Sequence, residues 1–372
     1  MKTLILSANT GQGHNSCAKA IQEAFQCRGD ECDIRDVFGL VSERLSRMIS
    51  FNHDRTYRKS PAKSDAEYRF LEGHPQLFRQ GRFIYRVMSI GRGKVERCIR
   101  QGGYDAVICT HVLAAMMLTA ATQKGGLHVK TAFVSTDYSC TPGVNGTCLD
   151  CYFIPHESLA ADFLAAQIPP EKIMSTGIPV SRQFFPVSEK EKAAVNAAFG
   201  IAPEKRHLLV ACGSMGCGPI PELLRAVAAR LPEDWEVSVL CGTNRELKAL
   251  LEKEHASLPT VHIHGYVEDV PQLLSASDLF LTKPGGLSTS EAAAVAVPMV
   301  FVDAVAGCEA NNLRYFVAQG AAVSGDSPVK VAEACLALMN EPGRLHAMAD
   351  TLRTRAGIRA AERIVSIIKG EV

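Results

Sequence analysis

The stretch LFLTKPGGLSTSEAAAVA, residues 279–296, decides the fold class of this chain. The residues from Leu279 to Thr282 predict a buried strand, which a proline and two glycines then end. The serine- and alanine-rich run after them predicts a helix that begins near Ser288. A strand, a glycine turn and a helix in this order are typical of a βαβ unit in a parallel sheet.

The same alternation extends over most of the 372 residues. In the first half, strands are predicted at 3–7, 105–109, 130–135 and 151–155, with helices after Gly13 and at 114–123 and 157–166. In the second half, strands are predicted at 207–212, 236–241, 261–264, 279–282 and 299–302, and helices at 221–230, 245–255, 288–296 and 311–319. Such a length exceeds one ordinary core, so we predict an α/β protein of two doubly wound, Rossmann-like domains that are joined near residue 180 and face each other across a cleft.

The composition excludes several classes of protein. A hydrophobic content of 47% with 21% charged residues is ordinary for a folded protein, and a net charge of +1 argues against a nucleic-acid binder. No run approaches the roughly 18 apolar residues that a membrane-spanning helix needs. The three consecutive apolar residues from Leu4 to Leu6 are too few for a signal-peptide core, so we expect a cytoplasmic protein.

The charge is distributed unevenly. Between Val41 and Arg100, 14 Lys and Arg residues stand against 6 Asp and Glu, a local net charge of +8. Residues 40–100 also depart from the βαβ rhythm, and they are predicted to form a helical, basic insertion in the first domain. This segment is either a solvated helix face or a surface that binds an anionic membrane, with Arg79, Arg82 and Arg86 as candidate contacts.

Thirteen cysteines are more than such a chain usually carries, and several lie inside apolar runs, which is typical of reduced, core-filling thiols. Cys140, Cys148 and Cys151 lie close to His156 and raise the question of a metal site. A structural zinc site normally has two well-spaced pairs of ligands. We therefore expect no bound metal.

The first glycine turn includes Gly11 and Gly13 and is followed by His14. A dinucleotide site is weakly supported, although Asp36 ends a plausible second strand, because Ser16 stands where a third glycine is needed. A histidine at a helix N-terminus lies in a positive field that favours its neutral form, so it is able to act as a base. The alternative is a histidine that only makes a local hydrogen bond.

Two further turns suit a ligand that carries a diphosphate and a sugar. Residues 212–219 supply three glycines and a serine between a strand and a helix, as a diphosphate cradle requires, but no Gly-Lys-Ser/Thr follows as in a P-loop. Glu291 lies one turn into its helix, where a carboxylate can accept two hydrogen bonds from a vicinal diol. A capping box with Ser288 is the alternative for Glu291, and a ligand-free turn is the alternative for residues 212–219.

These motifs, in this order, resemble the family of monogalactosyldiacylglycerol synthases and processive diacylglycerol glucosyltransferases. A more distant similarity is to the N-acetylglucosaminyltransferase that completes the cell-wall lipid precursor. The resemblance covers nearly the whole chain except residues 40–100. The segments that carry it are Ser7 to Ala20, Thr176 to Phe184, Cys212 to Ile220, Cys241-Gly242, Gly265 to Val267 and Lys283 to Ala322.

The resemblance implies a GT-B fold. Residues 1–180 would form an acceptor and membrane domain, to which a C-terminal helix at 357–372 returns, and residues 181–356 a donor domain. The implied reaction is an inverting, metal-independent transfer of a hexose from a UDP-sugar, which is a co-substrate and not a cofactor. The acceptor would be a lipid, diacylglycerol, at the inner face of the cell membrane. The absence of any Asp-x-Asp motif agrees with metal independence.

The resemblance also implies roles for single residues. His14 would be the catalytic base and Asp137 a second candidate, with Gly11 and Gly13 in the acceptor and diphosphate loop. The donor would contact Gly213, Ser214, Met215, Gly216, Gly265, Tyr266, Val267, Lys283, Gly285, Gly286, Leu287, Ser288, Glu291, Glu309 and Asn312.

Two departures from the family pattern leave alternatives open. Residues 139–144 replace a His-Pro pair and a tryptophan that the family often has, and Cys308 stands where a glutamine is common. The sugar and the acceptor are therefore undecided by the sequence. A polyprenyl-linked or small-molecule acceptor, a UDP-sugar 2-epimerase and a non-catalytic UDP-sugar sensor are the other hypotheses.

Overall fold

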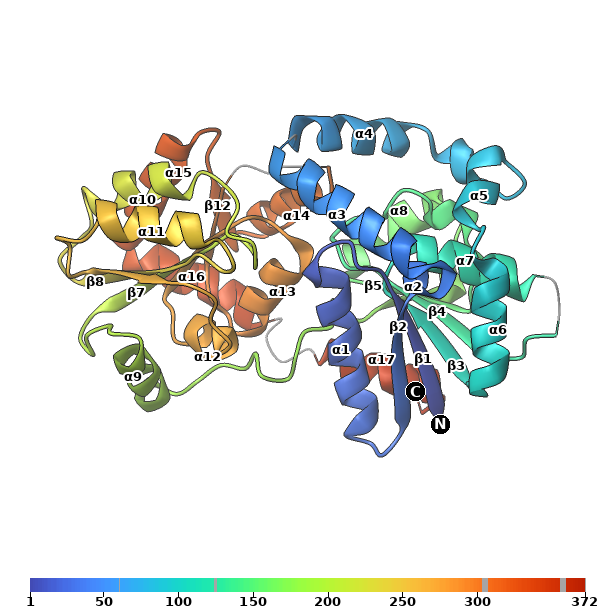
Figure 1. The fold of residues 1–372 in the computed structure, drawn as a ribbon. Coiled ribbons are helices and arrows are strands. Elements are labelled where there is room, and N and C mark those ends of the chain that lie inside the picture. Colours follow the sequence, from blue (N-terminus) through green and yellow to red (C-terminus); the bar gives the residue numbers. More distant parts are fainter. Residues whose placement is uncertain (60, 124–125, 303–306, 355–358, 372) are drawn as a thin grey trace. The chain divides into compact units, whose positions relative to one another are not determined.

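A computed structural model describes the backbone of residues 1–59, 61–123, 126–302, 307–354 and 359–371, and the side chains of residues 52–65 and 67 also lie outside the description. The chain divides into two compact units. The first consists of Met1–Ser181, Val305–Asn311 and Arg359–Val372, and the second of Arg182–Ala304 and Asn312–Ile358. Each unit is built on a six-stranded sheet with helices packed on its faces (Figure 1).

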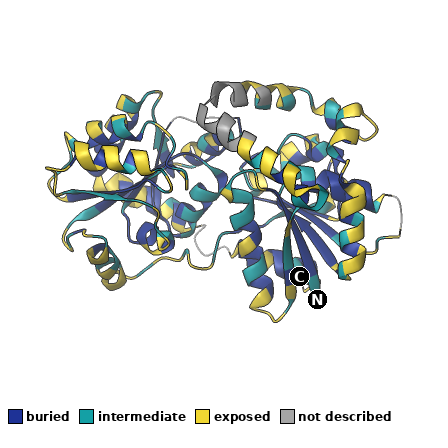
Figure 2. Cartoon of the chain, in the orientation of Figure 1, coloured by how far each residue is buried: buried dark blue, intermediate teal, exposed yellow. Residues whose placement is uncertain are grey.

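All strand pairs of the first sheet are parallel, and their order is β2-β1-β3-β4-β5-β6. The strands are β1 (Lys2–Ser7), β2 (Glu31–Asp36), β3 (Ala106–Cys109), β4 (Lys130–Val134), β5 (Cys151–Ile154) and β6 (Ile173–Ser175). The central strands are buried on both faces, as a parallel sheet requires (Figure 2).

Two sets of helices cover this sheet. Buried side chains of α1 (Gln12–Gln26) and α17 (Ala360–Lys369) pack against one set of strand residues. The other set packs against α2 (Val37–Val41), α6 (Arg92–Gly102), α7 (Val112–Thr122) and α8 (Ala160–Ala165). Because α17 comes from the end of the chain, the first unit is completed only when the C-terminal segment returns to it.

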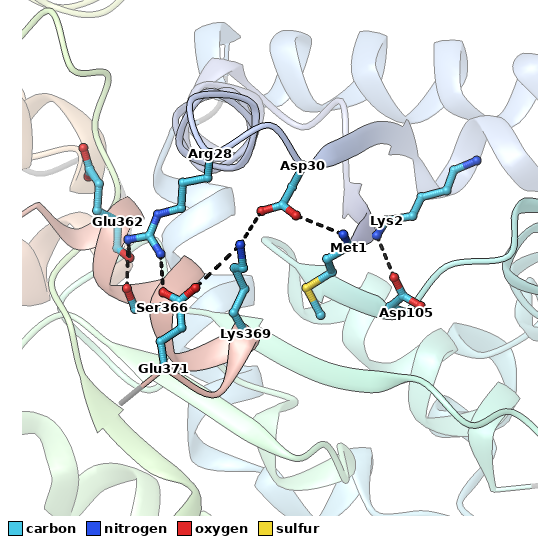
Figure 3. A network of polar contacts seen from close by, with 9 residues as sticks. All are labelled: Met1, Lys2, Arg28, Asp30, Asp105, Glu362, Ser366, Lys369 and Glu371. Carbon is cyan, nitrogen blue, oxygen red and sulfur yellow. Dashed lines mark hydrogen bonds and ion pairs between the residues drawn. The ribbon is translucent and has the colours of Figure 1, made fainter.

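Polar contacts hold this returning helix in place (Figure 3). The Lys369 ammonium lies 2.9 Å from a carboxylate oxygen of Asp30, and the N-terminal amine contacts the other oxygen of Asp30 at 2.9 Å. The hydrogen bond from Lys369 lowers the pKa of Asp30. Arg28 pairs with Glu371 at 2.5 Å and donates to Ser366 Oγ at 2.8 Å. The two ends of the chain are therefore joined through one carboxylate.

The segment between β2 and β3 forms α3 (Glu43–Lys59), α4 (Pro61–Gly73), a 3₁₀ turn (Pro75–Phe78), α5 (Phe83–Met88) and α6. The predicted helical insertion at 40–100 is therefore helical, but its last helix is part of the layered core. Val95 and Ile99 of α6 are buried against the sheet, so the added part is confined to α3, α4 and α5. No helix among the described residues is long and apolar enough to cross a membrane.

The second sheet is also parallel, with the order β12-β11-β10-β7-β8-β9. Its strands are β7 (Arg206–Ala211), β8 (Trp235–Leu240), β9 (Val261–His264), β10 (Leu279–Thr282), β11 (Met299–Phe301) and β12 (Ala322–Ser324). Its helices are α9 (Glu189–Ala198), α10 (Ile220–Ala228), α11 (Arg245–Glu254), α12 (Val270–Ser275), α13 (Gly286–Ala294), α15 (Pro328–Met339) and α16 (Pro342–Arg353). Helix α14 (Gly307–Ala318) belongs to the second unit from Asn312 onward, whereas its residues up to Asn311 are grouped with the first unit. One hydrophobic core joins α10, α11, α15 and α16 to this sheet.

The predicted fold class, two doubly wound α/β units, is confirmed. The prediction missed β6 and β12, which are only three residues long and lie at sheet edges. Helix α13 begins at Gly286, two residues earlier than predicted, because Gly285 has the extended backbone of an N-cap. The serine- and threonine-rich run is thus already helical.

In each sheet the order of the strands reverses at one point. Ligand sites of such folds are expected beside this reversal. In the first unit β1 lies between β2 and β3, and in the second β7 lies between β8 and β10. Open α/β sheets bind ligands at the carboxyl ends of the strands beside such a reversal. The loops after β1 and β3, and those after β7 and β10, are therefore the places to look for function.

Candidate active site

The loop after β1 is held in shape by side chains. The Asp36 carboxylate accepts hydrogen bonds from Asn9 N at 3.3 Å and from Gly39 N at 2.9 Å. Ser7 Oγ donates to Asn15 Oδ1 at 2.7 Å, and Asn15 Nδ2 donates to Asn9 Oδ1 at 2.8 Å. Asp36 thus accepts hydrogen bonds from backbone amides at the start of α2. This structural role accounts for a carboxylate at the end of β2 in a chain that lacks the complete dinucleotide-binding motif.

His14 lies in the first turn of α1, directly after this loop. Its Nδ1 is 2.7 Å from the carbonyl oxygen of Thr110, the residue that follows β3. A carbonyl can only accept, so Nδ1 carries the proton and Nε2 of the neutral ring carries the lone pair. Thr136 Oγ1 lies 3.2 Å from the same Nδ1. The histidine therefore has the tautomer that a general base acting through Nε2 requires.

A second histidine, which the sequence analysis missed, contacts His14. His111 is the N-cap of α7, and its Nδ1 accepts a hydrogen bond from Leu113 N at 3.2 Å. Its ring meets the ring of His14 edge to face, with centroids 4.8 Å apart, and Phe38 lies 6.2 Å away on centroids. His111 lies two residues after the strand predicted at 105–109, and this position could have identified it as a site residue. The sequence did not show that this strand pairs with the strand before His14.

Asp137 lies in the loop after β4. Strand β4 ends at Val134, so Asp137 is three residues beyond the strand. The loop is tightened by Ser135 Oγ, which donates to the carbonyl oxygen of Asp137 at 3.0 Å. Thr136 of this loop contacts His14. The loop that carries Asp137, the second base candidate, therefore lies next to His14, the first candidate.

In the second unit, two glycine turns interlock beside the strand reversal. Gly216 has a φ of 55°, and a Cβ there would lie 2.3 Å from the carbonyl oxygen of Cys241. Gly242 has a φ of 56°, and its Cβ would lie 2.1 Å from the carbonyl oxygen of Ser214. Only glycine allows this approach. The outer part of the first turn, at Gly213 and Ser214, is left exposed, as a backbone cradle for an anion would be.

The turn after β10 lies against the turn after β7. Lys283 is buried, and a Cβ on Gly218 would lie 3.3 Å from its Cε, so the lysine side chain crosses from one turn to the other. On the other side, the fully buried Asn312 donates from Nδ2 to the carbonyl oxygen of Pro284 at 2.9 Å. Asn312 therefore supports the turn Lys283–Gly286 from within the second unit.

Glu291 lies in the second turn of α13. Because this helix begins at Gly286, Ser288 is inside the helix, and the capping-box explanation of Glu291 is wrong. Ser290 Oγ donates back to the carbonyl oxygen of Gly286 at 2.7 Å. The Glu291 carboxylate has no hydrogen-bond or ion-pair partner among the described residues, and burial raises its pKa to about 7. A carboxylate in this state is suited to a ligand that brings hydrogen-bond donors.

The other candidate residues lie farther from the strand reversal or deeper in the fold. Gly265, Tyr266 and Val267 follow β9, which is an edge strand, and the Tyr266 side chain is 66% exposed. Leu287 and Ser288 are half-buried in the first turn of α13, Met215 is half-buried in the turn after β7, and Glu309 is buried in α14. Gly11 is the N-cap of α1 with a φ of 85°, and Gly13 lies within that helix.

Within the described part of the chain, no group of three or more His, Cys, Asp or Glu side chains is arranged to hold a metal ion. The thirteen cysteines, all among the described residues, form no disulfide. Cys151 is buried in β5, whereas Cys148 is exposed and Cys140 is half-buried. Burial raises the pKa of Cys140 to about 12, which favours the protonated thiol over the thiolate that metals bind.

Two family models match the chain. Residues 14–180 match the monogalactosyldiacylglycerol (MGDG) synthase family, and residues 206–341 match the glycosyl transferases group 1 family. The processive diacylglycerol beta-glucosyltransferase of Bacillus cytotoxicus is 26% identical over 373 residues, which cover 100% of this chain and 94% of the relative. The enzyme of the same name from Bacillus cereus is 27% identical with the same coverage.

Solved structures match over the whole chain. MurG of Acinetobacter baumannii has a TM-score of 0.65 at 15% identity, with 100% of both chains covered. The UDP-GlcNAc 2-epimerase of Neisseria meningitidis, bound to UDP-GlcNAc, has a TM-score of 0.62 at 15% identity, also with 100% of both chains covered. These likenesses confirm the GT-B fold. The family models and full-length relatives confirm the resemblance that the motifs indicated.

Proposed function

We propose, starting from the premise that this chain is a glycosyltransferase of the GT-B fold, that it transfers a hexose from a UDP-sugar to diacylglycerol with inversion and without a metal ion. The names of the curated relatives support the lipid acceptor. The observation that carries the proposal is the His14 imidazole, whose Nδ1 is bonded to the Thr110 carbonyl so that Nε2 is its basic nitrogen.

The second unit supplies the proposed donor site. Glu291 accepts hydrogen bonds from the two ribose hydroxyls of UDP, and these bonds replace the partner that its carboxylate lacks among the described residues. The exposed turn at Gly213 and Ser214 faces the diphosphate, together with the N-terminus of α10. Lys283, which is buried between the two turns, adds a positive charge close to the leaving group.

The proposed reaction is a single displacement. The acceptor oxygen forms a bond to the anomeric carbon of the sugar while the bond from that carbon to the diphosphate oxygen breaks. His14 Nε2 takes the hydroxyl proton, and UDP leaves with the bonding electron pair. General-base assistance contributes typically 10²–10⁴-fold, and backbone amides directed at the diphosphate oppose its growing charge.

Exposed apolar and basic side chains of residues 79–90, on α5 and next to its two ends, support contact with a membrane surface. Phe83 and Ile90 are 79% and 70% exposed, and Val87 lies between them at 43%. Arg79, Arg82 and Arg86 are exposed on the same segment, and no acidic side chain among the described residues pairs with them. Tyr85 on the opposite side of the helix is buried against Phe78 and Met116. We propose that this face binds an anionic leaflet, apolar side chains entering it and arginines pairing with its phosphates.

The function is tested with purified protein, diacylglycerol dispersed in vesicles, and UDP-glucose, UDP-galactose or UDP-N-acetylglucosamine in turn. We expect UDP release that depends on the lipid, with a glycolipid product detected by mass spectrometry. Isomerisation of the sugar nucleotide without glycolipid formation would instead identify a 2-epimerase, an activity whose structures share this fold. UDP binding with neither reaction would identify a sensor.

The membrane face is tested by sedimentation with vesicles that contain or lack phosphatidylglycerol. A Phe83→Ser/Ile90→Ser variant should sediment less with anionic vesicles than the wild type does. Val329→Ser is the matched control, because Val329 is 58% exposed but lies in the second unit, at the start of α15. Equal binding by all three proteins, or equal binding to neutral and anionic vesicles, would contradict this part of the proposal.

A further inference from the structure

The two faces of the second sheet differ in composition. One face contributes a row of aliphatic residues on β7 and β8 to the large hydrophobic core: Leu208, Val210, Val237 and Val239. Because side chains alternate along a strand, the residues between these positions and their register partners on β9 point to the other face. That face carries five polar residues, which we call the histidine face: His207, Glu236, Ser238, His262 and His264.

His207 is fully buried, and one nitrogen of its ring lacks a partner. Ser277 Oγ donates its hydrogen to the carbonyl oxygen of Leu273 at 2.7 Å, so it accepts from His207 Nδ1, which lies 3.2 Å away. Nε2 therefore carries the lone pair of the neutral ring, and it has no hydrogen-bond partner among the described residues. A second proton on this ring would place a buried charge at a nitrogen that no protein group there accepts from.

The two carboxylates that contact the histidine face are already engaged. Glu236 Oε2 accepts hydrogen bonds from His262 Nε2 at 3.0 Å and from the backbone N–H of Ala202 at 3.3 Å. Asp278 forms an ion pair with Lys192 of α9, and its other oxygen accepts from a backbone N–H of β7 at 2.8 Å. Further positive charge on this face would therefore gain little compensation.

Positive groups around the histidine face oppose its protonation. Burial, with the nearby charges of Lys192 and of the other two histidines, lowers the pKa of His207 to about 3. Burial, with His262 and with Lys248 of α11, also lowers the pKa of His264. The Lys248 ammonium pairs with a carboxylate of its own helix. In the folded protein at neutral pH, His207 and His264 are therefore neutral.

Helix α9 lies against the histidine face, next to α12 (Figure 1). Asn196 is the one residue of α9 that is buried, and Phe199, directly after the helix, meets the ring of His264 edge to face with centroids 5.5 Å apart. The acidic residues of α9, Glu189 and Glu191, are exposed in its first turn, and α12 has no ionisable side chain. The attachment of α9 thus depends on polar and aromatic contacts more than on an apolar core.

We propose that α9 is attached to the second sheet in an acid-sensitive way, so that protonation of His207 and His264 favours a form in which α9 has left the histidine face while β7, β8 and β9 remain paired. Helix α9 is the first element of the second unit along the chain and belongs to no strand pair, so it can leave without breaking the sheet. This inference is independent of the proposed reaction.

Proton linkage gives the size of the effect. An exposed histidine has a pKa of about 6.5, so the released form binds protons that the attached form excludes once the pH falls below this value. Attachment is therefore strongest above about pH 6.5 and weakens as the pH falls. Between pH 7.5 and 5.5 the equilibrium constant for release should rise about tenfold for each histidine that becomes exposed, and about 100-fold for both.

Hydrogen exchange of backbone amides tests this, with rates at pH 7.5 and 5.5 corrected for the intrinsic effect of pH on exchange. We expect the protection of α9 to fall about 100-fold between the two pH values, while α10 and α15 change far less. Amides of α11 are followed as well, because the buried His255 at its end also has a lowered pKa. They show whether acid loosens the unit elsewhere.

His264→Gln keeps a polar side chain that cannot be charged, so the fall in protection at α9 should shrink about tenfold. His262→Gln, at a half-buried position of the same face, tests the contribution of its neighbouring charge if His264→Gln does not fold, and it should also reduce the fall. His346→Gln, at an exposed position of α16, should leave the fall unchanged. Equal loss of protection in α9, α10 and α15, no loss in α9, or the same loss in wild type and His264→Gln would overturn the proposal.

Discussion

The strand reversals of the two units have the same topology but different chemistry. At the carboxyl ends of β1 and β3 the side chains are imidazoles, and backbone groups decide which nitrogen of each ring carries the proton. At the carboxyl end of β7 the backbone itself is exposed, in a turn that only glycine can form. The buried Lys283 and Glu291, a carboxylate with a raised pKa, follow the neighbouring strand β10. In the proposed function, the first unit serves proton transfer and the second unit holds the anionic, hydroxyl-rich donor.

This difference shows how one architecture is divided between two tasks. In a parallel sheet, the carboxyl ends of the strands and the N-termini of the following helices lie along one edge. This edge favours anions because the backbone N–H groups at the helix N-termini are available to bind them. The first unit modifies it by placing histidines within the first turn of α1 and at the cap of α7. The second unit keeps the turns nearly free of side chains. Substitutions in the two places should therefore change different steps of the reaction.

The largest effect is expected at His14. His14→Gln removes the basic nitrogen, so turnover with diacylglycerol should fall 10²–10⁴-fold while the Kd for UDP, measured by calorimetry, stays the same. The control is His346→Gln, at an exposed position of α16 in the second unit. If His14→Gln instead weakened UDP binding and left turnover intact, the proposed division between the two units would be wrong.

Glu291 is the corresponding residue of the second unit. Glu291→Ala should weaken UDP binding about 10- to 150-fold, because hydrogen bonds to a charged group contribute about 1.5–3 kcal/mol. Turnover at saturating donor should change far less than the affinity. Glu333→Ala, at an exposed position of α15, serves as the control. Unchanged UDP affinity would remove Glu291 from the donor site.

The raised pKa of Glu291 predicts a dependence of stability on pH. Its folded-state pKa of about 7 exceeds the ordinary value of 4.5, so the folded state binds more protons than the unfolded state between these values. This carboxyl therefore lowers the free energy of unfolding as pH rises from about 4.5 to 7. Glu291→Gln should stabilise the ligand-free protein at pH 8 by up to about 3 kcal/mol and have little effect near pH 4.5. Urea unfolding at both pH values measures this, and equal effects at the two would contradict the raised pKa.

The smallest effect, and the most selective one, is expected at Gly285. No atom lies within 4 Å of a Cβ built there, and its φ of −71° is open to alanine, so Gly285→Ala should change stability by less than about 0.5 kcal/mol. A methyl group at the N-cap of α13 would meet a ligand bound at that turn, so UDP-sugar affinity should fall severalfold. Gly343→Ala, whose surroundings are equally open, should leave UDP-sugar affinity unchanged.

The sequence by itself was sufficient for most strands of the fold and for the glycine turns that follow them. Apolar runs of four to six residues, followed by glycines and then by a helical period, are local patterns, and they predicted most strands to within one or two residues. Gly213, Gly216 and Gly285 were found in the same way. Glu291 was recognised too, although its two possible roles remained open because the start of α13 was misplaced.

Only the tertiary structure decided which of these local features meet. The order of the strands brings β7 beside β10, so that Lys283 reaches Gly218 from a distant part of the chain. It brings β1 beside β3 as well, so that Thr110 sets the tautomer of His14 and His111 packs against it. Local periodicity carries no information about which strands are neighbours, because pairing depends on the packing of whole layers. The sequence therefore determined the parts of the candidate site, and the fold determined their partners.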